Sequence, residues 1–410
     1  MKILQVNICL NVLSTGRITE QIGETIINEG WDSYVLTYGP LKESRSHVIK
    51  SDGGIEHFMH RVINRFCDCQ GYGSYFATKK VIKRIETINP DIIHLQNIHD
   101  CWLNFPQLFD YIIKNKKPVV WTFHDCWAFT GHCAYFDDAD CLRWQKLCYD
   151  CPLKREFSLD LSQFNYKKKK SLFSVVPNMT IVPVSRWLED IAKQSFLGGK
   201  RIITIHNGVD LDMFKPRQTD LRKKLNISDN FVLLGVASNW GKSKGIFDFI
   251  SLSENTNYTI VLIGIPDKMK ELLPANIIVI SKTDSQEQLS EYYSMADVFV
   301  NPTYHDNFPT VNLEALACGT PIVGYRTGGS PEAVEEGAND NLEKELCGEF
   351  VEQGDLSALI NVIEKIRNER KEVRLKRKDA CRKRAVAMFD KKDCYRKYIE
   401  IYRTVINQNE

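Results

Sequence analysis

The chain has 410 residues, of which 43% are hydrophobic and 26% charged, and its formal net charge is +2. This composition excludes a disordered or fibrous chain, and the near-neutral charge gives no indication of a nucleic-acid partner. The length predicts two domains or more. The sequence contains no run of 18 apolar residues, so we expect no transmembrane helix.

The first residues and the cysteines bear on the compartment. Gln5, Asn7 and Asn11 interrupt the apolar start of the chain, which favours a buried first strand over a signal peptide. The 13 cysteines are an odd number in a long sequence. This argues against a secreted disulfide scaffold and for a reducing compartment. We therefore expect a cytoplasmic protein.

Short apolar runs rich in β-branched residues alternate with helix-like stretches along the chain. Continuous apolar runs of this kind are typical of strands buried on both faces, and their alternation with helices predicts parallel sheets. They form two series, which predict two doubly wound α/β domains. The predicted strands are Ile3–Ile8, Ser33–Tyr38, Asp91–Leu95, Val119–Phe123, Thr180–Val184 and Ile202–Ile205, then Phe231–Ala237, Thr259–Ile263, Ile277–Ile280, Val298–Asn301 and Pro321–Gly324.

An Asn-Gly turn and a proline within Asn207–Pro216 mark the domain boundary. We expect domains at 1–206 and 207–384, followed by a C-terminal helical segment at 385–410. That segment carries a tyrosine-rich face and is expected to pack back on the N-terminal domain. Ligands bind beyond the carboxyl ends of strands in such sheets, so two sheets predict a site in the cleft between the domains.

The most informative segment follows the strand that ends at Asn301. Asp306 lies in a loop, a helix is predicted to begin near Pro309 or Thr310, and Glu314 lies about one turn inside it. Amides at a helix N-terminus bind phosphate, and carboxylates accept hydrogen bonds from sugar hydroxyls. An acidic loop followed by a solvated helix glutamate would be the alternative.

This segment closely resembles the donor signature of family-4 glycosyltransferases, in which seven residues separate two acidic residues. The resemblance continues through Glu314-Ala-Leu-Ala-Cys-Gly-Thr-Pro and Gly328-Gly-Ser-Pro-Glu332, and it covers nearly the whole chain. It implies the GT-B fold, two Rossmann-like domains with an interdomain cleft, the first on the acceptor side and the second binding the nucleotide sugar. It also implies that Asp306, in place of the more usual glutamate, contacts the donor sugar, and that Glu314 contacts the ribose. The helix start between them supplies further donor-binding residues: Asn307, Phe308, Pro309 and Thr310.

Three further positions match parts of the same family pattern. Lys244 resembles the family's phosphate-binding lysine. Asn239 stands where the family often has an arginine, so either Lys242 supplies the second positive charge or that charge is missing. Gly16 matches the family's N-terminal glycine loop, although a tight turn explains it equally well. His124 follows a strand and matches a histidine that contacts the donor sugar.

Other strand ends supply candidates for the acceptor side. His99 and Asp100 follow the strand Asp91–Leu95. Ser185 is a candidate N-cap, and Arg186 after it can reach an acceptor phosphate. The run Lys167–Lys170 predicts either a solvated helix face or a contact with anionic lipid.

A cysteine-rich insertion, residues 126–154, follows His124 and is not part of the family signature. Cys133, Cys141, Cys148 and Cys151 include a C-x2-C pair and predict a structural zinc site. Unlinked thiols or one or two disulfides are the alternatives. Cys126 and His132 are substitute ligands.

The resemblance implies a retaining transferase that needs no catalytic metal. Its expected partners are a UDP- or GDP-sugar and a glycan or polyprenyl-diphosphate-linked glycan acceptor, in surface polysaccharide synthesis at the inner face of the cytoplasmic membrane. A nucleotide-sugar epimerase of the same architecture and a non-catalytic sugar-nucleotide-binding subunit are the alternatives.

Overall fold

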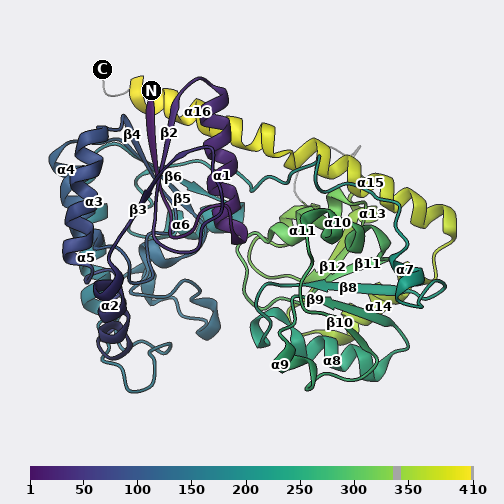
Figure 1. The fold of residues 1–410 in the computed structure, drawn as a ribbon. Coiled ribbons are helices and arrows are strands. Elements are labelled where there is room, and N and C mark those ends of the chain that lie inside the picture. The colour runs from purple at the N-terminus through teal and green to yellow at the C-terminus, as the bar shows by residue number, and fades with distance from the viewer. Residues whose placement is uncertain (336–342, 408–410) are drawn as a thin grey trace. The chain divides into compact units, whose positions relative to one another are not determined.

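The computed structural model describes residues 1–335 and 343–407, and the chain divides into two compact units (Figure 1). The first unit comprises Met1–His206 and Tyr395–Glu410, and the second comprises Asn207–Cys394. Residues 385–394, which the sequence analysis groups with the C-terminal helical segment, therefore lie in the second unit. The last three residues of that predicted segment, 408–410, lie outside the described residues.

The first unit is built on a parallel sheet of seven strands in the order β3-β2-β1-β4-β5-β6-β7. Because the chain leaves β1 towards β2 and β3 and then returns to β4 on its other side, the switch point lies between β1 and β4. The strands are β1 (Lys2–Val6), β2 (Asp32–Thr37), β3 (His47–Lys50), β4 (Ile92–Leu95), β5 (Val119–Phe123), β6 (Met179–Pro183) and β7 (Arg201–Ile202).

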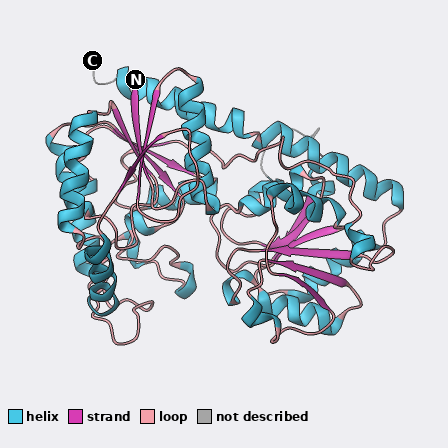
Figure 2. Cartoon of the chain, viewed as in Figure 1, coloured by secondary structure: helices cyan, strands magenta, loops and turns pink. Residues whose placement is uncertain are grey.

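Helices lie on both sides of this sheet (Figure 2). Their apolar faces cover strands that are buried throughout, such as β4 and β5. The helices are α1 (Leu13–Asn28), α2 (Gly54–Cys67), α3 (Tyr75–Ile88), α4 (Phe105–Lys114), α5 (Ser162–Phe173), α6 (Arg186–Gln194) and the part of α16 (Lys391–Asn407) that begins at Tyr395.

The second unit repeats the plan with a six-stranded parallel sheet in the order β10-β9-β8-β11-β12-β13, whose switch point lies between β8 and β11. Its strands are β8 (Val232–Val236), β9 (Thr259–Ile263), β10 (Ile277–Ile280), β11 (Val298–Asn301), β12 (Ile322–Tyr325) and β13 (Gly348–Val351). The helices are α7 (Leu221–Lys224), α8 (Ile246–Asn255), α9 (Asp267–Lys270), α10 (Gln286–Met295), α11 (Thr310–Ala317), α12 (Glu332–Glu335), α13 (Lys344–Cys347), α14 (Leu356–Arg367) and α15 (Lys371–Phe389).

The core of the second unit lies between the sheet and α8 and α14. Leu233, Val300 and Val323 of the strands pack there with Phe249 of α8 and Ile363 of α14, all of them almost completely buried. Burial of one such side chain contributes about 1.5–3 kcal/mol. The β-branched and aromatic residues that predict the strands are therefore also the residues that close the core.

All eleven predicted strands are confirmed, with ends that shift by one or two residues except at Ile202–Ile205, where β7 stops at Ile202. Two strands, β3 and β13, were not predicted. Each lies at an edge of its sheet, and β3 has the burial pattern of a mostly exposed strand, so neither gives a continuous apolar signal.

The predicted C-terminal helical segment is divided by a break at Asp390, because α15 ends at Phe389 and α16 begins at Lys391. Asp390 has an extended ψ of 122° and its carboxylate accepts a hydrogen bond from Lys392 N at 2.9 Å. Gly208 packs against this break, where a Cβ would lie 2.5 Å from Lys391 Cα. The Asn207–Asp210 turn therefore holds the junction between α15 and α16. Val209 N donates a hydrogen bond to the carbonyl of Phe389, and Lys391 N donates one to the carbonyl of Val209.

The tyrosine-rich face of α16 is confirmed and lies against the first unit's sheet. Tyr398 hydroxyl and Thr122 hydroxyl lie 2.8 Å apart, and Tyr402 hydroxyl lies 2.7 Å from His94 Nδ1. Each ring buries a large apolar area while its hydroxyl finds a partner, as buried tyrosine requires.

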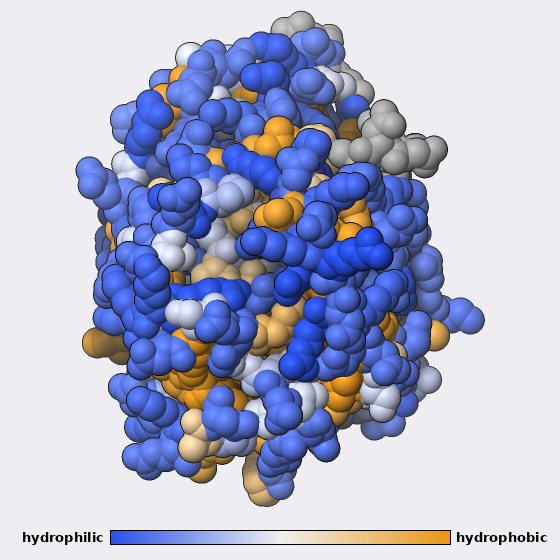
Figure 3. Space-filling view, turned by 90° about the vertical axis from the view of Figure 1, so that its right-hand side faces the viewer, coloured by the Kyte–Doolittle hydropathy of each residue, from blue (hydrophilic) through white to orange (hydrophobic). Residues whose placement is uncertain are grey.

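Hydrophilic side chains cover most of the face drawn in Figure 3, with apolar ones between them, as is usual for a protein surface. Within the described residues, every helix is too short or too polar to span a membrane.

Candidate functional site

The second unit brings Lys244 and Asp306 together beyond the carboxyl ends of its strands. Lys244 ends a short 3-10 helix, Lys242–Lys244, that follows β8, and Asp306 lies in the loop after β11. Lys244 Nζ lies 2.7 Å from Asp306 Oδ2, and it also donates to the carbonyl of His305 at 3.1 Å and to Thr303 Oγ1 at 3.4 Å. The two strands on either side of the switch point thus supply one cation and one carboxylate.

This ion pair remains open to solvent. The side chains of Lys244 and Asp306 are 31% and 22% exposed. Partly exposed pairs of this kind contribute about 0–1 kcal/mol, because water already solvates both groups. Lys242, two residues earlier, is exposed. A ligand anion can therefore replace Asp306 as the partner of Lys244 at little cost.

Two glycines allow the loops of this site to pack closely. Gly245 has φ of 70°, and a Cβ there would lie 2.3 Å from the carbonyl oxygen of Pro302. Gly328 has φ of 52°, and its Cβ would lie 1.9 Å from the carbonyl oxygen of Asp306. The first glycine of the Gly-Gly pair in the predicted signature is thus required by the main chain of the Asp306 loop.

The helix α11 begins at Thr310 after Pro309, as predicted. It ends where Gly319 takes φ of 79°, with Gly319 N bonding to Leu316 O and Thr320 N to Ala315 O, a Schellman motif followed by Pro321. The first amides of any helix have no acceptor inside it, so this end of α11 presents donors for an anion.

The residues between Asp306 and α11 form the packed floor of the loop. Asn307 and Phe308 are only 2% and 4% exposed. Phe308 packs against Phe389 with ring centroids 5.9 Å apart, and its carbonyl accepts a hydrogen bond from Asn207 Nδ2 at 3.1 Å. The Phe308 ring and the Phe308 carbonyl therefore hold the loop in place.

Glu314 is almost buried, and Tyr293 of α10 fixes its carboxylate. The side chain is 7% exposed, and Tyr293 hydroxyl donates to Glu314 Oε2 at 3.0 Å. The neighbouring Asn312 accepts a hydrogen bond from Asn301 Nδ2 at 2.8 Å, which ties α11 to the end of β11. The sequence analysis did not identify Tyr293, because nothing in a helix sequence shows which residue faces a carboxylate on another helix.

In the first unit, His124 ends a chain of hydrogen bonds at the switch point. His124 Nε2 lies 3.1 Å from Gln96 Oε1, and Gln96 Nε2 donates to Gln5 Oε1 at 2.9 Å. Burial lowers the pKa of His124 to about 4, against the opposing effect of Asp125. His124 is therefore a neutral imidazole at pH 7, with its Nε2–H directed at Gln96.

His99 lies in the opposite electrostatic environment. Its Nε2 lies 2.8 Å from Asp125 Oδ2 and its Nδ1 lies 3.4 Å from Asp100 Oδ1. Burial favours the neutral ring, but the two carboxylates prevail and raise the pKa of His99 to about 10. Burial likewise favours the neutral form of Asp125, but the charge of His99 prevails and lowers the pKa of Asp125. His99 is thus a fixed imidazolium, and Asp125 is a partner that the sequence analysis did not identify.

The loop after β4 carries a local strain that sequence does not reveal. Asp100 and Cys101 are consecutive non-glycine residues with positive φ, 79° and 56°. Such residues cost about 1–3 kcal/mol each and often occur at functional sites. The strain marks this loop, together with the His99–Asp125 pair, as a candidate acceptor-side feature.

The remaining predicted residues of the first unit lie at helix starts. Gly16 is buried in the first turn of α1, where a Cβ would lie 3.0 Å from Cys9 Sγ and 3.2 Å from Leu10 N. Ser185 caps α6 as predicted, accepting from Leu188 N at 3.1 Å. Arg186 is 60% exposed and pairs with Glu189 at 2.8 Å.

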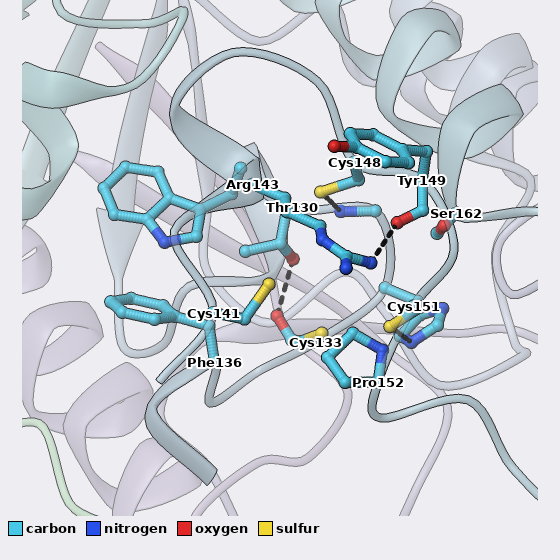
Figure 4. Close-up of a pocket in the computed structure, with 13 residues that line it drawn as sticks. Thr130, Cys133, Phe136, Cys141, Arg143, Cys148, Tyr149, Cys151, Pro152 and Ser162 are labelled. Atoms are coloured by element: carbon cyan, nitrogen blue, oxygen red, sulfur yellow. Dashed lines mark hydrogen bonds between the residues drawn. The ribbon is translucent and has the colours of Figure 1, made fainter. Parts of the chain in front are cut away.

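The cysteine-rich insertion forms a pocket in which Cys133, Cys141, Cys148 and Cys151 all take part (Figure 4). Among the described residues, the group with metal-ligand atoms within 4.8 Å of one another is His132, Cys133 and Cys151. A hydrogen bond from Cys133 lowers the pKa of Cys151, against the effect of burial. The structure thus places the substitute ligand His132 beside two of the four predicted cysteines.

Two sequence families match the chain, one over each half. The family described as "Glycosyltransferase Family 4" matches residues 15–213, and the family described as "Glycosyl transferases group 1" matches residues 217–385. The second range holds Lys244, Asp306 and Glu314.

The chain is also similar to proteins named for polysaccharide synthesis. It is 23% identical over 376 residues to the putative colanic acid biosynthesis glycosyl transferase WcaC of Escherichia coli, covering 86% of this chain and 90% of that protein. It is 24% identical over 248 residues to the capsular polysaccharide biosynthesis glycosyltransferase CapM of Staphylococcus aureus, covering 56% and 63%.

Solved structures share the fold. Sucrose-phosphate synthase from Thermosynechococcus elongatus superimposes with a TM-score of 0.73 at 18% identity, covering 99% of both chains. HepE from Anabaena in complex with UDP and glucose gives a TM-score of 0.67 at 17% identity, covering 98% of this chain and 100% of that chain. These likenesses confirm the predicted GT-B fold.

Proposed function

The chain belongs to the group 1 glycosyltransferases and has the GT-B fold, and from this premise we propose that it transfers a hexose-type sugar, with retention of configuration, from a nucleotide-sugar donor to a glycan or lipid-linked glycan. One observation carries the proposal. Lys244 and Asp306 lie 2.7 Å apart in the loops that follow the two strands at the switch point, where the resemblance to family-4 glycosyltransferases implies contacts with the donor's phosphate and sugar.

We propose that Lys244 exchanges Asp306 for the donor's diphosphate when the donor binds. A diphosphate carries more negative charge than Asp306 and accepts hydrogen bonds at several oxygens, so it competes for the ammonium group. Once released, the Asp306 carboxylate accepts a hydrogen bond from a sugar hydroxyl. Lys244 and the first amides of α11 then stabilise the charge that grows on the departing diphosphate.

Glu314 is assigned to the ribose hydroxyls of the donor. Tyr293 holds one of its oxygens, so the carboxylate is fixed in orientation before the donor arrives. At Asn307 and Phe308, whose side chains are buried, the donor contacts fall to the main chain. Thr310 and Pro309 set the start of the helix, and Lys242 is assigned an auxiliary electrostatic role.

His124 is assigned to the sugar as a hydrogen-bonding group and not as a general base. A base with a pKa of about 4 accepts protons poorly at pH 7, because its conjugate acid is too strong. In a retaining transferase the departing phosphate helps to take the acceptor proton. The proposed reaction therefore uses Lys244, Asp306 and His124 and no catalytic metal.

The names of the relatives support a surface polysaccharide as the product. WcaC and CapM are named for colanic acid and capsule synthesis, and HepE was crystallised with UDP and glucose. We therefore propose a UDP- or GDP-sugar as donor and a polyprenyl-diphosphate-linked glycan as acceptor. His99, Asp100 and Arg186 are assigned to the acceptor side.

A two-step assay tests this function. First, thermal unfolding is followed with a panel of UDP- and GDP-sugars, because a ligand of the native state raises the melting temperature. The stabilising donor is then incubated with polyprenyl-diphosphate-linked mono- and oligosaccharides. Release of nucleoside diphosphate that depends on acceptor, with a product of retained anomeric configuration, supports the transferase. An isomerised donor formed without acceptor indicates an epimerase, and binding without transfer to any acceptor indicates a non-catalytic subunit; either result overturns the proposal.

The helix α2 supports a location at an anionic membrane surface. Its polar side chains face the protein interior and its apolar ones face solvent. His57, His60 and Asn64 are buried, while Phe58 and Ile55 are 57% and 84% exposed. The buried histidines fix this orientation by hydrogen bonds, since Ser74 Oγ lies 2.8 Å from His57 Nδ1 and 2.9 Å from His60 Nδ1. Met59, Val62, Ile63 and Phe66 complete the exposed apolar face.

The surroundings of this face fit a bilayer with acidic lipids. Arg61 and Arg65 are exposed on the same helix. Two exposed apolar residues from other segments, Phe76 and Leu159, extend the face on either side. The Phe76 amide donates to the Glu56 carboxylate and the Leu159 amide donates to the carbonyl of Phe66, so both residues are held against α2. A helix with apolar side chains flanked by arginine is typical of the membrane interface. We propose that this face docks on the lipid that carries the acceptor.

The predicted lipid contact at Lys167–Lys170 fits the structure less well. Lys169 is 1% exposed and donates to the carbonyl of Trp127 at 2.6 Å, so it cannot reach a membrane.

Vesicle sedimentation tests the docking face. The wild-type chain should bind vesicles of phosphatidylglycerol and phosphatidylcholine, and Phe58→Asp with Ile63→Asp should reduce binding at least tenfold. Leu375→Asp changes an equally exposed apolar residue of α15 and serves as the matched control. Equal binding by all variants, or equal binding to pure phosphatidylcholine, contradicts the proposed face.

A further inference from the structure

The insertion at 126–154 contains a group of side chains that the transfer reaction does not use. His132, Cys133 and Cys151 place one nitrogen and two sulfur atoms within 4.8 Å of one another, and His132 Nε2 lies 3.3 Å from Cys151 Sγ. In a tetrahedral zinc site with Zn–S of about 2.3 Å and Zn–N of about 2.0–2.1 Å, ligand atoms lie about 3.3–3.8 Å apart. The distance between His132 Nε2 and Cys151 Sγ already falls in this range, and the Cys133 sulfur lies within 4.8 Å of both atoms.

His132 is oriented as zinc-binding histidines are. Its Nδ1 lies 2.9 Å from Asp68 Oδ2 at the end of α2, which leaves Nε2 directed at Cys151. The Asp68 carboxylate is itself fixed by the amide of Leu161 at 3.2 Å. A carboxylate on the far ring nitrogen sets both the tautomer and the direction of a metal-binding histidine.

Cys148 is the fourth candidate. It belongs to the same C-x2-C turn as Cys151, is 9% exposed, and its Sγ accepts a hydrogen bond from Gly131 N at 3.2 Å. Gly131 directly precedes His132, so this bond joins the two halves of the group. Arg143 fixes the turn itself by donating to the carbonyl of Tyr149 at 2.8 Å.

The charge of the surroundings fits three thiolates. Three thiolates and one Zn²⁺ carry a net charge of −1, which is costly to bury without a cation nearby. Lys169 can supply that charge: it is 1% exposed, and its Nζ donates to the carbonyls of Trp127 and Thr130 and lies 3.5 Å from the Trp127 ring centroid. Burial lowers the pKa of Lys169 to about 7, and negative charge on Cys133 and Cys148 raises it.

We propose that His132, Cys133, Cys148 and Cys151 hold one structural zinc ion, with Asp68 as the partner that orients His132 and Lys169 as the countercharge. With these four residues as ligands the site would be closed, as structural zinc sites are, and would leave no position for a reacting water. The ion would connect the insertion to α2 through Asp68. It would thereby support the start of the insertion. There Asp125 Oδ1 accepts a hydrogen bond from Trp127 N at 2.9 Å, and Asp125 Oδ2 lies 2.8 Å from His99 Nε2.

The ligand set differs from the four cysteines that spacing alone predicts. Cys141 lines the same pocket, but Cys148 is the one that shares the C-x2-C turn with Cys151 and accepts a hydrogen bond from Gly131, the residue before His132. The C-x2-C pair and the His-Cys pair form two adjacent clips, which is the usual construction of a zinc site. Cys141→Ser is therefore the matched control for Cys148→Ser.

Metal analysis of the purified full-length chain tests the site without any assay of transfer. We expect about one zinc per chain, retained in Cys141→Ser and Cys126→Ser and reduced at least fivefold in Cys148→Ser and Cys151→Ser. His132→Ala should also lose zinc, whereas His132→Cys should keep it. Because a serine variant can fail to fold, each is examined by far-ultraviolet circular dichroism before its metal content is read.

Cobalt replacement provides a second measurement on the wild-type fold. Co²⁺ bound to this site should give thiolate-to-cobalt absorption with the intensity of three sulfur ligands, and Zn²⁺ should remove it. Absence of zinc with all thiols reactive, or a Cys133–Cys151 disulfide found by mass spectrometry, overturns the proposal. Loss of zinc in Cys141→Ser with retention in Cys148→Ser overturns the ligand assignment.

Discussion

Lys244–Asp306 of the second unit and His99–Asp125 of the first are both cation–carboxylate pairs that follow strands of a parallel sheet, yet they differ in burial. The Lys244 and Asp306 side chains are 31% and 22% exposed, whereas those of His99 and Asp125 are both 13% exposed. In the buried pair the carboxylates raise the pKa of His99, and His99 lowers the pKa of Asp125, each against the effect of burial. The difference teaches that the open pair can change partners when a ligand arrives, while the closed pair holds a fixed charge and a fixed loop.

The largest expected effect comes from removing a charged side chain of the proposed donor site. Lys244→Ala and Glu314→Ala should each lower kcat/KM for transfer by about 10²–10³-fold, since each removes a charged group aimed at the donor. Steady-state release of nucleoside diphosphate measures this. Lys242→Ala is the matched control, because Lys242 lies on the same short helix but is exposed, and it should change kcat/KM by less than tenfold. Equal rates in Lys244→Ala and Lys242→Ala would contradict the assignment of Lys244.

The next effect concerns the loop that carries Asp306. Gly328→Ala should destabilise the protein by about 3 kcal/mol, because φ of 52° and a contact of 1.9 Å between its Cβ and Asp306 O are both unfavourable. Urea denaturation, followed through the unfolding transition of the second unit, measures the change in the free energy of unfolding. A Cβ on Gly241 meets no atom within 4 Å, so Gly241→Ala should be nearly neutral. Two equally stable variants would show that the loops pack differently.

The closed pair is tested through pH. The pKa of His99 is raised in the folded state to about 10, so its stabilisation is complete below the unfolded value of about 6.5 and is lost as pH rises towards 10. Asp125→Asn removes the main carboxylate, so the variant should lose less stability than wild type between pH 7 and 10. Melting temperatures across this range, taken as the difference between the two proteins, measure the effect. Parallel curves would contradict a charged His99.

The smallest effect sharpens the role of Asp306. Asp306→Glu restores the residue more usual in the family and keeps the charge beside Lys244. We expect a change of a few-fold in the ratio of kcat/KM values between two donor sugars, since a shift of one methylene alters one hydrogen bond by about 1 kcal/mol. Competition between two donors that share a nucleotide measures this ratio. Unchanged ratios would remove Asp306 from the sugar contact.

Much of the fold was predictable because buried parallel strands leave continuous apolar runs. All six strands of the second sheet except β13 were found this way. The helix α2 could not be interpreted correctly, because its apolar residues have ordinary helical spacing and would be expected to face a core. Its orientation depends on hydrogen bonds from His57 and His60 to Ser74, residues separated by 17 and 14 positions.

The candidate site shows the same division. Asp306, Glu314 and Lys244 were predictable because a long signature fixes their order and spacing. Tyr293, the Asp125 partner of His99 and the burial of Lys169 were not, since each depends on which side chains meet across separate elements. The spacing of the cysteines indicated a metal site, but only the contact from Asp68 shows why His132 points into it.

The most direct test of the central claim is equilibrium binding of UDP and GDP to the full-length chain by isothermal titration calorimetry, in wild type, Lys242→Ala, Lys244→Ala and Glu314→Ala. The proposed donor site predicts that one nucleotide binds the wild type and Lys242→Ala with similar Kd, and that Lys244→Ala and Glu314→Ala weaken it at least tenfold, about 1.4 kcal/mol or more. The same Kd in all four proteins, or no binding of either nucleotide to wild type, would contradict it.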